Sequence, residues 1–193
     1  MPSISATISA TLDAHLEAIR VLRTQEATIR ELGEMLVARL RAGNRIFLCG
    51  NGGSAADAQH IAAEMVCRFE AHRRALPAIA LTTDTSALTA IANDFGYERV
   101  FARQVEALAR PGDLLIGIST SGNSGNIIAA VEQARDMGVA TLGLLGGDGG
   151  KLRGLVNHEM RVPVRETARI QECHILIGHI WCGMIDEAFA EPV

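Results

Sequence analysis

The chain has 193 residues, enough for one domain with a full hydrophobic core but short for two independent domains. Hydrophobic residues make up 48% and charged residues 21% of the chain, which argues against disorder. A formal net charge of −4, no basic block and only 4% aromatic residues exclude a general nucleic-acid or membrane surface. No signal-peptide core or membrane-spanning apolar run is apparent, so we expect a cytoplasmic protein. Its cysteines are then free thiols without zinc or CxxC spacing: Cys49, Cys67, Cys173 and Cys182.

The N-terminal part of the sequence predicts amphipathic helices. Apolar residues recur at helical spacing from Ile8 to Leu40. This pattern indicates two helices, or one helix bent near Thr24, ending at Gly43. We therefore divide the chain into a helical segment, 1–42, and a domain, 43–193. The apolar stripe of this segment must be buried against another surface, which is either its own domain or a partner subunit.

Beyond Gly43, predicted strands alternate with predicted helices. We expect Ser54 to cap the first of these helices in a capping box with Asp57, and Thr85 to cap the second. The alternation predicts the α/β class, with a parallel sheet covered by helices on both faces. The expected strands are 45–49, 78–81, 114–119, 141–145 and 159–162, and the expected helices are 54–69, 86–92, 101–109, 126–137 and 168–189.

A glycine turn follows the first predicted strand. The segment from Gly50 to Ala55 fits the G-x-G-x-x-A pattern, so a dinucleotide site is one interpretation. That fingerprint also requires an acidic residue at the end of the second strand. The nearest candidate, Asp84, lies three residues beyond Leu81 in a threonine-rich turn. The dinucleotide interpretation is therefore weak.

A second loop, after the third predicted strand, places four hydroxyl groups at the start of a helix. Backbone amides, the helix dipole and hydroxyls together can hold a phosphate without a lysine. The alternative is a helix cap rich in serine and threonine that binds no ligand. The hydroxyls belong to Ser119, Thr120, Ser121 and Ser124.

Two helices carry polar residues that could perform chemistry. His60 and Glu64 share one face of the helix after the glycine turn, and Arg68 extends that face. A surface ladder with a Glu64–Arg68 pair is the simpler interpretation, but the alanines around these residues suggest that something approaches closely. On the last helix, Gln171 and His179 could bind one metal only if their side chains reach toward each other. The remaining histidines favour hydrogen-bonded core positions: His15, His72, His158 and His174.

Together these motifs resemble phosphoheptose isomerases of the sugar isomerase (SIS) domain family, from about residue 43 to the end of the last helix. The resemblance implies a flavodoxin-like, doubly wound, five-stranded parallel sheet and a homotetramer with sites at subunit interfaces. It also implies conversion of D-sedoheptulose 7-phosphate to D-glycero-D-manno-heptose 7-phosphate for heptose synthesis. The motifs are Cys-Gly-Asn-Gly-Gly-Ser at 49–54, His60 with Glu64, Ala-Asn-Asp at 92–94, Ser-Thr-Ser-Gly-Asn-Ser at 119–124, and Arg-Ile-Gln-Glu at 169–172 with His179.

The resemblance also implies roles for individual residues. Glu64 looks like the general base and His179 like the general acid. Family members bind one zinc ion per subunit and no nucleotide cofactor, which here implies the ligands His60, Glu64, Gln171 and His179. The implied substrate contacts are Asn51, Gly52, Gly53, Glu64, Asn93, Asp94, Ser119, Thr120, Ser121, Ser124 and Gln171.

Two alternatives to this reaction stay open. SIS domains also resemble proteins without catalytic activity, such as replication-initiator-associating proteins and the sensor halves of sugar-responsive regulators. A binding protein needs no acid and base, so the presence of Glu64 and His179 favours an enzyme. An isomerase of another phosphosugar would use the same chemistry and would differ only in the wall of its pocket.

Overall fold

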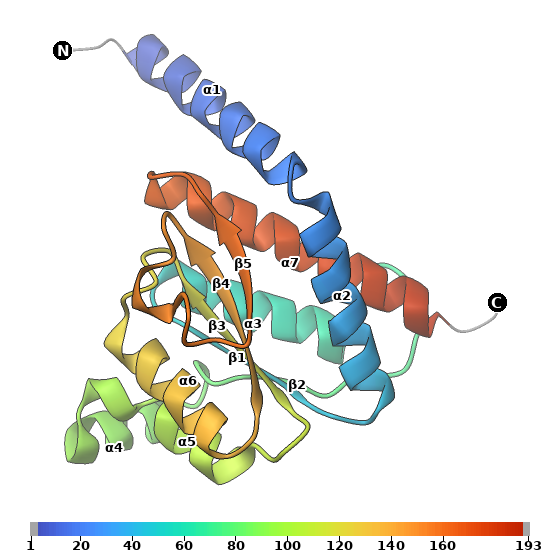
Figure 1. The fold of residues 1–193 in the computed structure, drawn as a ribbon, viewed down its shortest axis with the longest axis vertical. Coiled ribbons are helices and arrows are strands. Elements are labelled where there is room, and N and C mark those ends of the chain that lie inside the picture. The colour runs from blue at the N-terminus through green and yellow to red at the C-terminus, as the bar shows by residue number, and fades with distance from the viewer. Residues whose placement is uncertain (1–3, 191–193) are drawn as a thin grey trace.

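The computed structural model describes residues 4–190, which form an α/β fold around a five-stranded sheet (Figure 1). The strand order is β2-β1-β3-β4-β5, and every neighbouring pair is parallel. This arrangement confirms the predicted flavodoxin-like, doubly wound sheet. The strands are β1 (Ile46–Gly50), β2 (Ala78–Ala80), β3 (Leu114–Ser119), β4 (Ala140–Gly146) and β5 (His158–Val162).

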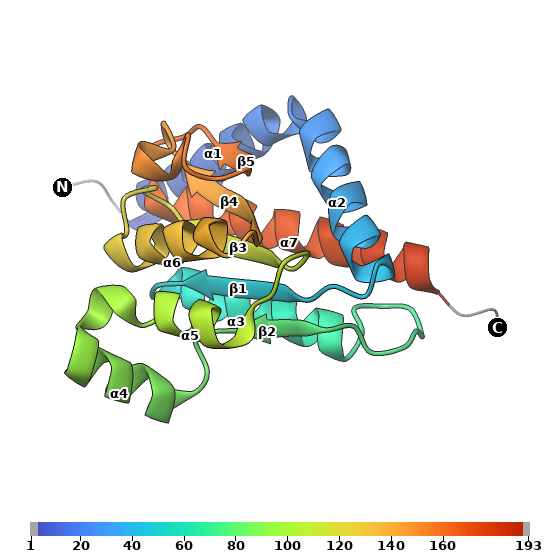
Figure 2. The same ribbon diagram turned by 60° about the horizontal axis from the view of Figure 1, so that its bottom comes forward.

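Helices cover both faces of the sheet (Figure 2). One face is covered by α2 (Glu26–Arg41), α3 (Gly53–Val66) and α7 (Thr167–Phe189). The other is covered by α5 (Ala102–Leu108) and α6 (Gly125–Asp136), with α4 (Thr85–Phe95) at the edge of that layer. Short 3₁₀ turns follow α4 at Tyr97–Arg99 and β4 at Gly150–Leu152. With helices on both faces, the central strands are buried throughout, as their apolar sequences predict.

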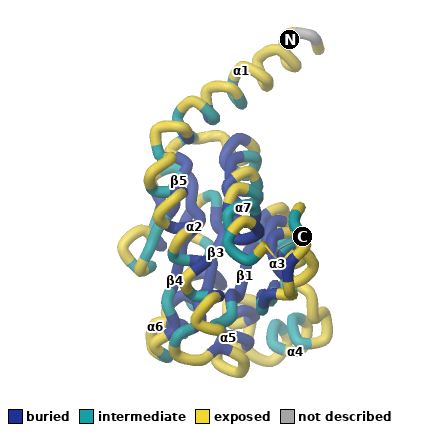
Figure 3. The backbone as a smooth tube through the Cα atoms, turned by 90° about the vertical axis from the view of Figure 1, so that its right-hand side faces the viewer, coloured by how far each residue is buried: buried dark blue, intermediate teal, exposed yellow. Residues whose placement is uncertain are grey.

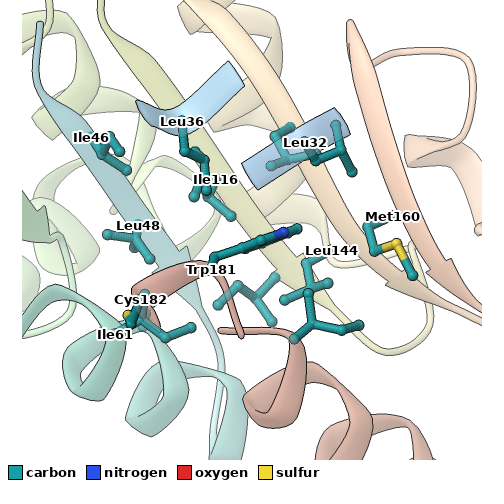
Figure 4. Close-up of a cluster of buried hydrophobic side chains, with 14 of the residues drawn as sticks. Leu32, Leu36, Ile46, Leu48, Ile61, Ile116, Leu144, Met160, Trp181 and Cys182 are labelled. Carbon is teal, nitrogen blue, oxygen red and sulfur yellow. The ribbon is translucent and has the colours of Figure 1, made fainter. Parts of the chain in front are cut away.

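The larger core lies between the sheet and α2, α3 and α7. Trp181 is fully buried there, among Leu36, Ile116 and Leu144 (Figure 4). Its indole N–H donates a hydrogen bond of 3.0 Å to the carbonyl of Ile29 on α2. The helix α2 therefore packs on its own chain, which is one of the two surfaces expected for the N-terminal helices.

The first helix, α1 (Ile4–Arg23), extends away from the rest of the chain (Figure 1). It ends at Arg23 and α2 begins at Glu26, so the predicted break near Thr24 is confirmed. Its C-terminal part joins the core through Ala18 and Leu22, whereas most of its length is exposed (Figure 3). The exposed side chains include an apolar row at four-residue spacing, which we call the α1 row: Ile4, Ile8, Leu12 and Leu16.

Both predicted helix caps are wrong. Gly52, with a φ of 56°, is the N-cap of α3, so Ser54 lies buried inside the first turn and Asp57 does not complete a capping box. A glycine tolerates this positive φ, and the chain turns directly from strand to helix. Asp84, not Thr85, caps α4: its carboxylate accepts a hydrogen bond of 2.9 Å from the backbone N–H of Ala87.

Candidate active site

The sheet topology brings the two predicted loops together. Strands β1 and β3 are neighbours, with Gly50 paired to Ile118. The chain leaves β1 toward α3 on one face and leaves β3 toward α6 on the other. The glycine turn and the serine loop (residues 119–124) therefore flank the crevice at which ligands bind in open parallel sheets.

A pair of asparagines fastens these loops to each other. Asn51 and Asn126 exchange two amide hydrogen bonds of 2.8 Å each, and Asn126 is buried. The hydroxyl of Tyr97 also donates to Oδ1 of Asn51, at 3.2 Å. The side chain of Asn51, expected from the sequence to contact the substrate, thus links two loops. Asn126 and Tyr97 were missed because the sequence pattern does not show what lies across the crevice.

The serine loop has the features of an anion site. The Oγ atoms of Ser119 and Ser124 lie 3.1 Å apart, and Ser119 also accepts from the N–H of Gly122. Ser124 is the N-cap of α6 but its side chain makes no capping hydrogen bond, so the first amides of α6 have no side-chain partner there. The loop packs tightly on the turn after β4, because a Cβ on Gly122 would collide with the carbonyl of Gly149. Hydroxyls, amides and the helix dipole therefore point to the same place.

The helices α3 and α7 lie side by side and bring the predicted acid and base together. Gly178 permits the close approach, since a Cβ there would lie 2.6 Å from the side chain of Ile61. The Nε2 atoms of His60 and His179 are 3.0 Å apart, and Nε2 of His60 lies 3.5 Å from a carboxylate oxygen of Glu64. Either imidazole can be the donor in this contact, depending on the tautomers of the two rings.

Gln171 lies near the start of α3. Its amide occupies the space beside Gly53, where any Cβ would collide with it. The distance along α7 between Gln171 and His179 is matched along α3, where Gly53 lies beside Gln171 and His60, about two turns later, lies beside His179.

Asp57 is a buried carboxyl on α3, for which the sequence predicted only a role in a helix cap. Burial raises the pKa of Asp57, while Gln171, His60 and His179 act in the opposite direction. Its Oδ2 atom is buried without a hydrogen-bond partner among the described residues. One sequence signal could have identified Asp57: it stands three positions before His60, which places both residues on the same helix face.

Three other residues that the sequence singled out make contacts with their own sequence neighbours. Arg68 lies beyond the end of α3 and donates to the carbonyl of Glu70, so the surface ladder with Glu64 does not form. Asn93 and Asp94 are exposed at the end of α4, where the amide of Asn93 donates to Asp94 at 2.8 Å. Their contact with a substrate stays a prediction.

A contact between α1 and α7 lies next to the site. Nδ1 of His15 is 2.6 Å from a carboxylate oxygen of Glu172, which follows Gln171. The guanidinium of Arg169 bonds to Glu172 and to the carbonyl of Thr11 on α1. The sequence pattern predicted no chemical role for the first helix. It also gave no sign that His15 pairs with Glu172.

The residues around His60 and His179 offer few ligands for a metal ion. Among residues 4–190, no three His, Cys, Asp or Glu side chains are grouped closely enough to hold a metal by themselves. The two imidazoles nevertheless converge. Two nitrogen ligands on one tetrahedral zinc ion lie about 3.3 Å apart, given bonds of roughly 2.0 Å, and the Nε2 atoms of His60 and His179 are 3.0 Å apart. The spacing of these two nitrogens is compatible with one zinc ion, and Glu64 and Gln171 as its further ligands stay a prediction.

Neither disulfides nor membrane helices occur in the described part of the chain. All four cysteines are free, and Cys67 alone among them is exposed. None of the helices between residues 4 and 190 has the length and apolar character needed to cross a membrane.

Comparisons with known proteins show which family this chain resembles in sequence and in structure. Residues 11–146 match the SIS domain. The phosphoheptose isomerase of Aliarcobacter butzleri is 59% identical over 174 residues, which cover 90% of this chain and 92% of that protein. The structure of a phosphoheptose isomerase from Neisseria gonorrhoeae matches with a TM-score of 0.91 and 43% identity, over 96% of this chain and 100% of that one. That of Francisella tularensis matches with a TM-score of 0.92 and 39% identity, over 97% and 100%.

Proposed function

This chain belongs to the SIS-domain family of phosphoheptose isomerases, aldose–ketose isomerases of sugar phosphates, and from that premise we propose its substrate, site and assembly. The substrate is D-sedoheptulose 7-phosphate and the product is D-glycero-D-manno-heptose 7-phosphate, a precursor for the heptose of lipopolysaccharide or another surface glycan. The observation that carries the proposal is the grouping of Glu64, His60 and His179 where α3 packs on α7, in a sheet whose topology brings the glycine turn and the serine loop to the ends of neighbouring strands. The identity to isomerases over most of the chain disfavours a non-catalytic binding protein.

The residue types suit an ene-diol reaction. The phosphate binds to Ser119, Thr120, Ser121 and Ser124 and to the first amides of α6, while Asn51, Gly52, Gly53, Asn93, Asp94 and Gln171 contact the sugar. Glu64 removes the proton from C1 of the ketose and returns it to C2. His179 moves protons between the two oxygens, so that a carbonyl at C2 becomes a carbonyl at C1. Neither step requires a redox cofactor or a nucleotide.

The residues also support one zinc ion per subunit, held by His60, Glu64, Gln171 and His179. When bound, zinc would act as a Lewis acid toward the sugar oxygens. We expect the purified protein to contain close to one equivalent of zinc by elemental analysis. A His60→Ala variant that is folded and still contains a full equivalent would refute this ligand set.

The decisive experiment compares the wild-type protein with Glu64→Gln, using sedoheptulose 7-phosphate with zinc supplied. We expect turnover by the wild type and a loss of kcat of about 10²-fold or more in the variant, because a general base typically contributes 10²–10⁴-fold. The matched control is Glu132→Gln, an exposed glutamate on α6, which should retain full activity. No wild-type turnover would refute the substrate, and an active Glu64→Gln would refute the base.

We further propose a homotetramer with its sites at subunit interfaces, in the cytoplasm. The α1 row leaves four large apolar side chains exposed, and α7 exposes Leu176 and Ile180. Exposed apolar patches of this kind mark interaction surfaces. The four free cysteines suit a reducing compartment.

A further inference from the structure

The ring of Phe69 lies against the imidazole of His179. The two rings are stacked, with centroids 5.4 Å apart and planes inclined by 22°. The ring of His60 meets the same imidazole edge-on, at 5.1 Å and 66°. The χ2 torsion of a histidine is broad and only weakly restricted by itself. Contacts from two directions therefore set the plane of this ring.

Phe69 belongs to the segment 67–77, which joins α3 to β2 without regular secondary structure. Such a segment needs tertiary contacts to hold one conformation. Asp186, buried on α7, provides them: its Oδ2 atom accepts hydrogen bonds from the backbone N–H groups of Glu70, at 2.6 Å, and Ala71, at 2.8 Å. Asp186 lies seven residues after His179, and seven residues are close to two helical turns. The residue next to Phe69 is thus anchored to the helix face that carries His179.

A buried ion pair completes this anchor. Nε of Arg73 lies 2.6 Å from Oδ1 of Asp186, and both side chains are at most 4% exposed. The other guanidinium donors bond to the carbonyls of Met65 and Arg74, and to that of Glu64 at 2.7 Å. Burial opposes the charge of Asp186, but the bonds from Glu70, Ala71 and Arg73 outweigh it and lower its pKa. A buried pair with its donors satisfied is rigid, so α7, the segment and the end of α3 are held together.

We propose that Phe69 is a positioning residue, which fixes the plane of the His179 ring toward His60 and is itself held in place by the Arg73–Asp186 pair. This inference rests on the proposed role of His179 in catalysis. Phe69 carries no group that can exchange a proton, so it acts only through the imidazole. Its loss should therefore slow the chemical step and leave substrate binding largely unchanged.

The test uses Phe69→Leu, which removes the ring and keeps an apolar side chain, and Phe69→Tyr, which keeps the ring. The matched control is Phe189→Leu, a partly buried phenylalanine at the end of α7 that packs on Arg74. Both test variants leave the Arg73–Asp186 pair intact. Thermal unfolding of each variant verifies that it is folded.

The first readout is the NMR signal of the His179 ring protons in the metal-free protein, assigned by comparison with His179→Gln. A stacked ring shifts these protons upfield. We expect the shift in the wild type, Phe69→Tyr and Phe189→Leu, and its loss in Phe69→Leu. An unchanged signal in Phe69→Leu would overturn the stacking.

The second readout is steady-state kinetics with sedoheptulose 7-phosphate. We expect kcat of Phe69→Leu to fall about tenfold to a hundredfold, as is typical when a catalytic group is misplaced, with KM within about twofold of wild type. Phe69→Tyr and the control should keep their kcat. A normal kcat in Phe69→Leu would overturn the positioning role. Full activity of His179→Gln would instead refute the role of His179, and the ring-proton shift would still report the stack.

Discussion

Two histidines five residues apart on α7 occupy opposite environments. His179 lies beside α3, with His60 and Phe69 against its ring. His174 points into the core, where its Nε2 donates a hydrogen bond of 3.0 Å to the carbonyl of Leu145. Its Nδ1 has no partner among the described residues. A core position was predicted for His174 and is confirmed, whereas His72, given the same interpretation, is exposed.

The stability of the protein should depend on pH through His174. Burial lowers the pKa of His174 from 6.5 to about 4, and the bond to Leu145 opposes this only in part. Because the folded protein holds the ring neutral, the stabilisation is fully present above pH 6.5 and is lost as the pH falls toward 4. Between pH 7 and 5 the loss is about 2 kcal/mol.

Urea unfolding at the two pH values, compared with His174→Gln, measures this effect. The glutamine can donate a similar hydrogen bond but does not titrate, so its free energy of unfolding should fall by about 2 kcal/mol less than that of the wild type over this range. Equal pH dependence of the two proteins would contradict the prediction.

At the scale of elements, the site depends on loops that face each other across β1 and β3. The glycine turn can follow β1 because Gly52 adopts a positive φ and Gly53 leaves room for Gln171. The Asn51–Asn126 pair then sets the distance between this turn and the serine loop. Each loop alone predicts one kind of ligand contact, and the asparagine pair holds the two loops next to each other.

We predict that Asn126→Ala weakens substrate binding. Without the two amide bonds the loops can separate, and KM for sedoheptulose 7-phosphate should rise about tenfold, equivalent to roughly 1.4 kcal/mol. The matched control is Asn157→Ala. Oδ1 of Asn157 accepts from the N–H and hydroxyl of Thr141, at the opposite edge of the sheet. Both variants should lose about 1–3 kcal/mol of stability, but only Asn126→Ala should change KM. A raised KM in both would show a general loss of stability instead.

At the scale of the whole molecule, α1 stands out because the chain leaves its apolar row uncovered. Its last turns pack on α7 and β5, while Ile4, Ile8, Leu12 and Leu16 are each more than half exposed. Full burial of a large aliphatic side chain stabilises by about 1.5–3 kcal/mol. A second copy of the chain that covered this row would therefore gain a substantial free energy of association.

We predict that Leu12→Glu shifts the protein toward smaller assemblies. A charge in the α1 row should oppose its burial, and light scattering should report a lower mass than for the wild type at the same concentration. The control, Asp13→Lys, changes a charge at a neighbouring exposed position outside the row. Activity should fall with the mass if the sites lie between subunits. A monomeric wild type, or a variant with unchanged mass, would contradict the proposal.

Much of the architecture follows from the sequence alone. The alternation of apolar strands with amphipathic helices predicted the five-stranded parallel sheet, and strand boundaries agree within one or two residues. The serine loop was recognised because its hydroxyls are neighbours in sequence, and His60 with Glu64 because four residues make one helical turn. These features depend on local spacing, which a sequence displays directly.

The tertiary structure decided which residues from distant parts of the sequence contact each other. Four contacts join residues 75 or more positions apart: Asn126 with Asn51, Phe69 with His179, Gln171 with Gly53, and His15 with Glu172. The order of the sheet and the packing of α3 on α7 create these contacts, and no periodicity encodes them. The two helix caps were predicted wrongly for a related reason. The helices α3 and α4 begin earlier than expected, so Gly52 and Asp84 occupy the N-cap positions that were predicted for Ser54 and Thr85. The sequence thus determined which groups could perform the chemistry, and the packing of α3, α7 and the two loops decided which of them meet.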